Sequence, residues 1–268
     1  MVLKMTLLTQ KLMKLNSVQK IFFILLISNQ IIFAQKIDSS KTIKHFSGVI
    51  TATNNGISLL PNFSLGKPAV LFDMSFGGPK LSFDPMLRFA MNGKPWAFIF
   101  WFRYKLAAEK KFNMSVGAHP AFIFRETTLP SNGVSKNYLT AIRFIASEAT
   151  PTYVFNKHLS LGVHYLYSHG LTKDITQNTH FVAIRTPISN IPLGRAFFFS
   201  IIPQFYFLKM DSKSGTYINA TAILSKHNFP ISLSSIVSEE LKSTIGGKPF
   251  VWNIALNYNF NHKYLNQK

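Results

Sequence analysis

The chain has 268 residues, 47% of them apolar and 14% aromatic, and it carries 29 basic against 10 acidic side chains. It contains no cysteine, which excludes disulfides, thiolate metal sites and cysteine nucleophiles. Intrinsic disorder is excluded as well, because so much apolar surface can offset the entropy lost when the backbone is ordered. The length fits one large domain.

The first 34 residues are typical of an export signal. They contain four lysines and no acid, and Lys20 is followed by a short apolar run at 21–28. That run is too short for a bilayer, which needs about 20 apolar residues. With the small Ala34 at the expected cut, the pattern predicts a cleaved signal peptide at 1–34 and a short periplasmic lead-in at 35–46. The alternative is an uncleaved anchor, which the polar Asn29 and Gln30 disfavour.

The rest of the chain alternates with period two. Within 250–260, the even positions carry Phe, Trp, Ile, Leu, Tyr and Phe, whereas the odd positions carry Val, Asn, Ala, Asn and Asn. Side chains of a strand alternate between its two faces, so such segments are amphipathic as strands. Many are also long enough to cross a membrane when tilted, which takes about 9 to 11 residues. We predict twelve strands, at 47–60, 66–77, 80–92, 95–108, 111–126, 137–155, 158–169, 178–190, 196–209, 215–226, 230–240 and 248–261.

The connections between these strands alternate in length. Those after even-numbered strands are tight turns, whereas most after odd-numbered strands are longer and polar, at 127–136, 170–178, 209–215 and 240–248. Short turns at one rim and long loops at the other are typical of bacterial outer-membrane barrels, with the short turns in the periplasm. An even strand count also places both ends of the barrel at that rim.

Residues 252–260, WNIALNYNF, resemble the terminal-strand signal that the barrel insertion machinery reads, although eight residues follow Phe260. Together with the alternation and the loop pattern, they give the chain a resemblance to outer-membrane β-barrels of Gram-negative bacteria over 47–261, with a tail at 262–268. The resemblance implies an all-β fold, a single antiparallel up-and-down transmembrane barrel of about twelve strands. It also implies an exported, integral outer-membrane protein, whose partners are outer-membrane lipid, lipopolysaccharide and the insertion machinery.

Alternation alone does not say which face points outward. A soluble barrel of the lipocalin type would turn the bulky apolar set inward. The set here is dominated by Phe, Trp, Tyr and Leu, which is too bulky for twelve strands to share one lumen, whereas the opposite set is mostly Gly, Ala, Ser and Asn with some Arg. We therefore expect lipid on the Phe-rich face, with Trp96, Tyr104, Tyr167 and Tyr258 in the interfacial girdles.

This orientation predicts a charged lumen. Turns at 77–80 and 92–95 set Asp73 opposite Asp84 and Asp84 opposite Arg103, so the two carboxylates need a cation between them. A slip of two residues would make these contacts diagonal. We predict a lumen cluster of Asp73, Asp84, Arg103, Lys105 and Arg88. The further basic side chains expected to face inward, for a total excess of about four positive charges, are Arg125, Arg143 and Arg185.

Three functional hypotheses follow. A basic lumen could pass small, anionic solutes through a narrow pore. The same charges could merely pair inside a closed barrel, which then serves as an anchor or binds partners through its long loops. An outer-membrane acyl hydrolase is the third, for which the candidates Ser168 with His169 and Ser160 with His164 are poorly placed, being adjacent in sequence or about 13 Å apart along a strand.

The sequence predicts no metal or other cofactor. His164 and His169 are five residues apart and face opposite sides of a strand, so they cannot share an ion, and His119 is expected to be a packed polar residue. Export and strand alternation argue against nucleic acid as a partner, despite the many lysines.

Overall fold

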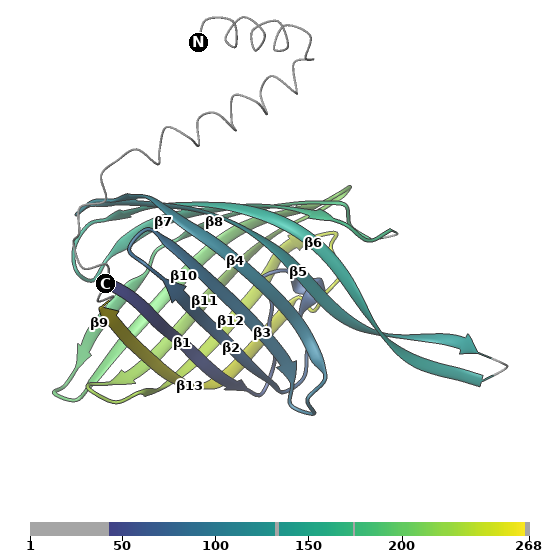
Figure 1. Ribbon diagram of the computed structural model, residues 1–268, viewed down its shortest axis with the longest axis horizontal. Helices are drawn as coiled ribbons and strands as arrows, with labels where there is room; N and C mark the ends of the chain where they lie inside the picture. Colours follow the sequence, from purple (N-terminus) through teal and green to yellow (C-terminus); the bar gives the residue numbers. More distant parts are fainter. Residues whose placement is uncertain (1–42, 132–133, 174, 266–268) are drawn as a thin grey trace, which may run out of the picture. The chain divides into compact units, whose positions relative to one another are not determined.

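The computed structural model describes residues 43–131, 134–173 and 175–265, which form an antiparallel β-barrel (Figure 1). The predicted signal peptide lies outside these residues. The predicted all-β fold is confirmed. The strands are Ile43–Thr53 (β1), Ala69–Gly77 (β2), Leu81–Ala90 (β3), Pro95–Ala108 (β4), Phe112–Ser131 (β5), Val134–Val154 (β6), Ser160–Gly170 (β7), Asn178–Arg185 (β8), Ile188–Leu193 (β9), Phe197–Met210 (β10), Lys213–Lys226 (β11), Ile231–Ser243 (β12) and Phe250–Leu265 (β13).

The barrel closes through pairing of its first and last strands. β1 pairs with β2 on one side and with β13 on the other, so the sheet has no free edge there. β8 and β9 are both hydrogen-bonded to β10, and they are separated only by Thr186 and Pro187. Since Pro187 has no backbone N–H to donate to a ladder, it explains the break. The two segments occupy one position, and the predicted twelve-strand barrel is confirmed.

The Phe-rich face points outward. Along β13, Trp252, Leu256 and Tyr258 are about half exposed, whereas the alternate Asn253 and Asn257 are buried. Large exposed apolar side chains recur in this way around the barrel, and so extensive an apolar exterior suits contact with hydrocarbon rather than water. The orientation predicted from side-chain size is therefore correct. None of the helices in the described part of the chain is both long and apolar enough to span a membrane.

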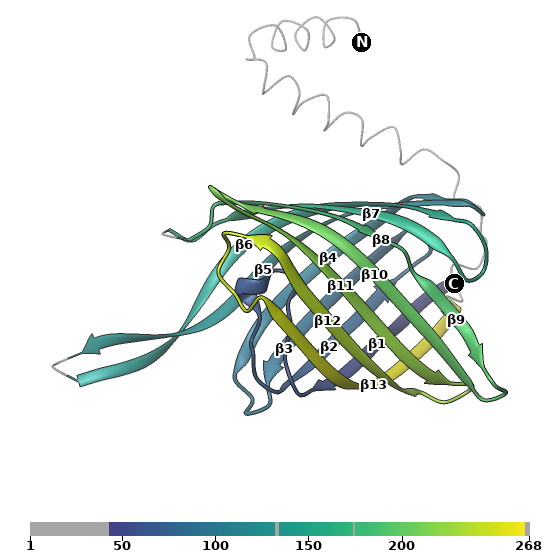
Figure 2. The ribbon, with the colours of Figure 1, turned by 180° about the vertical axis from the view of Figure 1, so that it is seen from behind.

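The two rims differ in the length of their connections, but two of the predicted long loops are not loops in the structure. Turns of at most five residues join β2 to β3, β4 to β5, β6 to β7, β9 to β10 and β11 to β12 at the short-turn rim. At the opposite, long-loop rim, the predicted loop at 127–136 is mostly strand, because β5 and β6 continue as a hairpin beyond the barrel wall (Figures 1 and 2). The predicted loop at 209–215 is a two-residue turn, Asp211 and Ser212.

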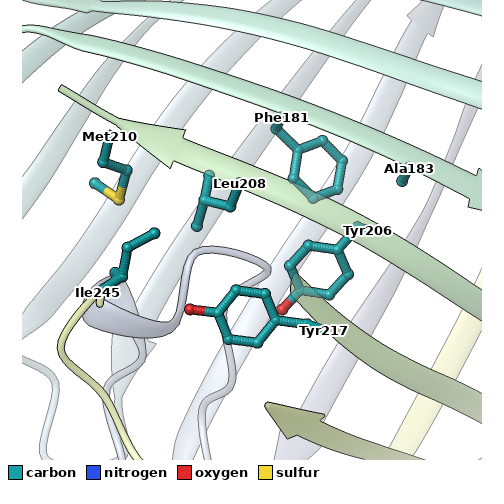
Figure 3. Packing of buried hydrophobic residues seen from close by; sticks show 7 residues of the cluster. All are labelled: Phe181, Ala183, Tyr206, Leu208, Met210, Tyr217 and Ile245. Atoms are coloured by element: carbon teal, nitrogen blue, oxygen red, sulfur yellow. The ribbon is translucent and has the colours of Figure 1, made fainter. Parts of the chain in front are cut away.

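The first long connection is a loop inside the mouth of the barrel, so the prediction of strand for 54–60 and 66–68, on either side of a short connection at 61–65, is wrong. β1 ends at Thr53 and β2 begins at Ala69, and the intervening mouth loop, 54–68, contains a short 3-10 helix, Pro61–Phe63 (η2). Its Leu60 and Phe63 pack against a cluster of buried side chains near the long-loop rim. Figure 3 shows this cluster, in which all members project from barrel strands except Ile245, which lies in the connection between β12 and β13. Those side chains are Phe181, Ala183, Tyr206, Leu208, Met210, Tyr217 and Ile245.

Trp96 is an exception to the predicted outward girdle. Phe89 pairs with Pro95 while Arg88 pairs with Ala97, so Trp96 is an extra residue in β4. Such a β-bulge reverses the direction of a side chain. Trp96 is only 3% exposed, and its indole Nε1 donates a 2.8 Å hydrogen bond to the carbonyl of Phe63 in the mouth loop.

Candidate lumen site

A chain of polar contacts crosses the inner wall of the barrel from β1 to β7. Arg103 on β4 lies at its centre: Nη1 donates to Asp84 Oδ2 at 2.8 Å, and Nε donates to Glu148 Oε1 at 2.6 Å. On one side Ser75 donates to Asp84 at 2.6 Å, and on the other His164 Nε2 lies 3.0 Å from Glu148 Oε2. We call this set, together with the imidazole of His45 that lies 3.0 Å from Ser75 Oγ, the lumen network.

Gly117 allows the central ion pair to form. Arg103, Gly117 and Glu148 are direct neighbours in the β4, β5 and β6 register, so Arg103 must cross a strand to reach Glu148. A Cβ atom at position 117 would lie 3.1 Å from Arg103 Cγ and 3.2 Å from Glu148 Oε1. The guanidinium also lies over the ring of Trp101, with its Cζ 4.4 Å from the ring centroid. The arginine is thus fixed by two carboxylates and an aromatic face.

The predicted register is off by two residues, as the geometry of the contacts shows. Between β3 and β4, Asp84 faces Trp101 and Arg103 faces Ser82. Between β2 and β3, Phe76 pairs with Phe83 rather than with Leu81. The Asp84–Arg103 contact survives as a diagonal ion pair. The predicted direct juxtaposition of Asp73 and Asp84 is wrong, since Asp73 pairs with Met86.

The other predicted cluster members lie apart from this network. Asp73 and Arg88 line a separate cavity in the lumen, and no ion pair joins either of them to another described side chain. Arg88 instead lies over the Trp96 ring, at 5.6 Å from its centroid. Lys105 is exposed at the short-turn rim, where its backbone N–H donates to the carbonyl of Lys80.

The three further arginines have three different environments. Arg185 faces inward and lines the same cavity as Arg88. Arg125 faces the mouth, where it donates to the carbonyl of Asn62 at 3.2 Å and covers the ring of Phe63, so it holds the mouth loop. Arg143 was expected to face inward, but it is exposed and alternates with the buried Phe144 on β6. This alternation places Arg143 on the outer face, and its backbone bonds to Leu171 and to the hydroxyl of Thr172 place it at the level of the long-loop rim.

Glu148 is the functional residue that sequence reasoning missed. It is 7% exposed and is the acid shared by Arg103 and His164. Residues 141–149, AIRFIASEA, carry one charge on each face and offer little size contrast, so alternation does not define which face is inward. Depth along the strand could have decided it, because Glu148 is mid-strand, where hydrocarbon forbids an outward carboxylate, while Arg143 is near a rim. With this correction the predicted inward set holds five bases against three acids, a smaller excess than expected.

The opposite side of the lumen is lined by uncharged polar side chains. We call it the amide wall; it comprises inward residues of β1 and β10 to β13. Here Asn253 Oδ1 accepts from the backbone N–H of Ile236 at 2.8 Å, and the amide of Asn257 donates to Ser234 Oγ at 3.0 Å. Its main members are Thr51, Gln204, Asn219, Thr221, Ser234, Ser238, Asn253 and Asn257.

Two cavities lie along this amide wall. A cavity of about 360 Å³ is bounded by the amide wall and by Asp73, Arg88 and Arg185. A larger space of about 790 Å³, the vestibule, lies between the mouth loop and the long-loop ends of β10 to β13. The two adjoin, since Ile57, Ser58, Tyr206 and Ser238 line both.

The serine and histidine candidates for hydrolysis are not brought together. Ser168 is buried, whereas the neighbouring His169 lies on the other face beside Asn178, at 3.3 Å. The imidazole of His164 is bonded to Glu148. His45 does contact Ser75, but the serine proton goes to Asp84, so the imidazole cannot take it as a base would. His119 is buried and packs against Trp101, with ring centroids 4.0 Å apart.

No protein-family model matches the chain, and no curated protein matches it in sequence. Several solved structures are similar in architecture. The KdgM porin is 9% identical with a TM-score of 0.48, covering 80% of this chain and 99% of its own. The NanC porin is 12% identical with a TM-score of 0.46, covering 82% and 100%. An outer-membrane channel from Pseudomonas putida F1 is 10% identical with a TM-score of 0.46, covering 85% and 97%.

Proposed function

We propose that this chain is an exported, integral outer-membrane protein that forms a narrow pore for small solutes, with a weak preference for anions. The observation that carries the proposal is the pair of adjoining cavities inside the barrel, one of which opens at the long-loop rim. A closed barrel filled by side chains would need no such polar space, whereas a solute path needs it throughout its length.

Part of the positive charge in the lumen is already neutralised by neighbouring carboxylates. Arg103 is neutralised by Asp84 and Glu148. Arg88 and Arg185 line the smaller cavity, together with the single acid Asp73. The surplus of one cation there supports a mild preference for anions rather than strong selectivity.

Reconstitution into planar bilayers tests this proposal. We expect discrete single-channel currents and an anion-to-cation permeability ratio above one. Replacing both cavity arginines, Arg88→Gln with Arg185→Gln, should lower that ratio by roughly two- to fivefold, because the cavity then retains only Asp73. The matched control is Lys242→Gln with Lys209→Gln, which removes two cations from the long-loop rim outside the cavity. Absence of current from folded, inserted barrels would refute the pore.

The mouth loop favours a second candidate, a closed barrel that acts as an anchor or binds a partner through its projecting β5–β6 hairpin. The loop packs Leu60 and Phe63 against the inner wall and is held there by Trp96 and Arg125. Replacing residues 57–64 by a short Gly/Ser linker separates the two. If current appears only in this variant, the native barrel is closed; if the native protein already conducts, the loop merely narrows the path.

A further inference from the structure

The short-turn rim carries cations at every connection. Four of its five turns contribute at least one basic side chain, Lys226 ends β11 beside the fifth turn, and Lys44 lies on β1; all of these side chains are exposed. Among the described residues of this rim there is a single acid, Glu109. We call the following seven basic residues the basic collar: Lys44, Lys80, Lys110, Lys111, Lys157, Arg195 and Lys226. Lys105 and Lys263 also lie at this rim, but by strand alternation they fall on the inward faces of β4 and β13.

The long-loop rim is different in kind. Its cations are mixed with acids that already have partners: Lys94 is paired with Glu126, and the carboxylate of Asp211 accepts the backbone N–H groups of Gln177 and Asn178. By contrast, no described ion pair involves a residue of the basic collar. The two rims therefore differ in their acids. Among the described residues, the long-loop rim carries Glu126, Asp211, Glu239 and Glu240 beside its lysines, whereas the short-turn rim, which holds both ends of the barrel, carries only Glu109.

The collar also lies next to the apolar exterior. Lys80 precedes Leu81, which is 60% exposed, and Lys111 precedes the exposed Phe112. Lys226 lies over the ring of Phe229, at 5.8 Å from its centroid, and Phe229 is itself half exposed. Cations that border an exposed apolar band occupy the level of lipid headgroups, where long side chains extend their charge to phosphate while their stems cover hydrocarbon.

We propose that the basic collar binds anionic phospholipid, recruiting headgroup phosphates of the leaflet that surrounds the short-turn rim. The inference rests on the membrane location proposed above but does not depend on the pore. A free anionic solute would be drawn to charges facing the lumen axis, whereas the collar follows the outer margin of the wall from strand to strand. Each collar cation at the phosphate level is expected to raise affinity by about fivefold in low salt, less where the charges are far apart.

Boundary-lipid association measures this directly. The full-length protein is reconstituted into phosphatidylcholine vesicles that contain trace spin-labelled phosphatidylglycerol or spin-labelled phosphatidylcholine, and the association constants of the two labels are compared. We expect phosphatidylglycerol to be preferred several-fold, and high salt to remove the preference. In the variant Lys80→Gln, Lys111→Gln, Lys157→Gln and Lys226→Gln, the preference should fall at least threefold.

Two matched variants guard against a trivial result. Neutralising four lysines of the opposite rim, Lys67, Lys173, Lys209 and Lys242, should leave the preference unchanged. Replacing the four collar lysines by arginine should also preserve it, which shows that charge rather than a local fold is measured. Equal loss in both Gln variants, or no loss in the collar variant, overturns the proposal. The proposal is also overturned if the collar variant keeps its preference for phosphatidylglycerol but has an altered anion permeability, because the collar charges would then act on the passing solute and not on lipid. None of these readouts requires the barrel to conduct.

Discussion

The two sides of the lumen solve the same problem in different ways. Both must present polar side chains inside a barrel whose outside is apolar. The wall from β2 to β7 uses full charges, of which Asp84, Arg103 and Glu148 neutralise one another within the lumen network. The amide wall uses short amides and hydroxyls, which satisfy one another and nearby backbone groups, as Asn253 and Asn257 do.

This difference determines where space remains. Arg103, Trp101, His119 and Glu148 fill their side of the lumen by packing against one another. The amide wall has short side chains, so the cavity of about 360 Å³ lies against it. A count of charged residues therefore says little about the charge that a solute meets.

The largest effect is expected from Arg103→Met. The substitution removes the cation from two half-buried or buried carboxylates, Asp84 and Glu148. Leaving buried charges uncompensated typically costs about 3–5 kcal/mol. We expect the free energy of unfolding, measured by urea titration in detergent micelles or lipid vesicles, to fall by that order.

The control for Arg103→Met is Arg185→Met, which removes an inward arginine that has no described ion pair and should cost less than about 1 kcal/mol. Adding Asp84→Asn and Glu148→Gln to Arg103→Met should recover much of the loss. If the two arginine variants lose the same free energy of unfolding, the ion pairs of Arg103 do not contribute to the stability of the barrel.

A smaller loss of unfolding free energy is expected when Arg103 is forced away from Glu148 and no charge is removed. Gly117→Val places side-chain atoms where Arg103 crosses to Glu148, and even its Cβ would be within 3.2 Å of both. Overpacking of this kind typically costs about 1–3 kcal/mol. Gly78→Ala is the control, since a Cβ there has no neighbour within 4 Å. If Gly117→Val unfolds no more readily than Gly78→Ala, Arg103 reaches Glu148 by another route.

The sequence predicts the charged wall only in part, and the reasons are physical. The number of strands and the direction of their apolar faces follow from alternation and side-chain size, and both signals are averaged over many residues. The Asp84–Arg103 contact follows from face and approximate register, so it tolerates a slip of two residues. The inward position of Glu148 is not predicted, because shifting the assignment of faces by one residue exchanges the inward and outward side chains of a whole strand. The charges on both faces of β6 leave that assignment undecided.

Two other features escape for a different reason. Trp96 points inward because it is the extra residue of a β-bulge. The alternation of residue types in the sequence does not show where this bulge lies. The mouth loop at 54–68 is apolar enough to resemble strand, since Ile57, Leu59 and Leu60 alternate or adjoin as strand residues would. The turn-forming residues Gly56, Pro61 and Gly66 are the signal that could have identified it as a loop.

On the amide wall, a single deletion should cost less than on the charged wall. Asn253→Ala removes the acceptor of the partly buried Ile236 N–H and the donor to the carbonyl of Asn55. One unsatisfied backbone group typically costs about 1–3 kcal/mol. We expect the lower part of that range in urea titrations, because water in the adjoining cavity can replace the amide. Asn219→Ala, for which no described hydrogen bond is lost, is the matched control. A cost above that of Arg103→Met would reverse the proposed ranking of the two walls.

The smallest effect is expected at the long-loop rim, where charge is exposed on both partners. A hydrogen bond from Lys94, and then its positive charge, hold the pKa of the Glu126 carboxyl below its usual value. The folded-state pKa is lowered, so the contribution to stability is present above the unfolded pKa and is lost as pH falls through the folded pKa. Carboxyl-detected NMR titration of selectively labelled glutamate should show this depression, and Lys94→Gln should remove it. Because both side chains are exposed, unfolding midpoints should barely change. A large change would mean that exposed rim charges contribute to stability as the enclosed ones around Arg103 do.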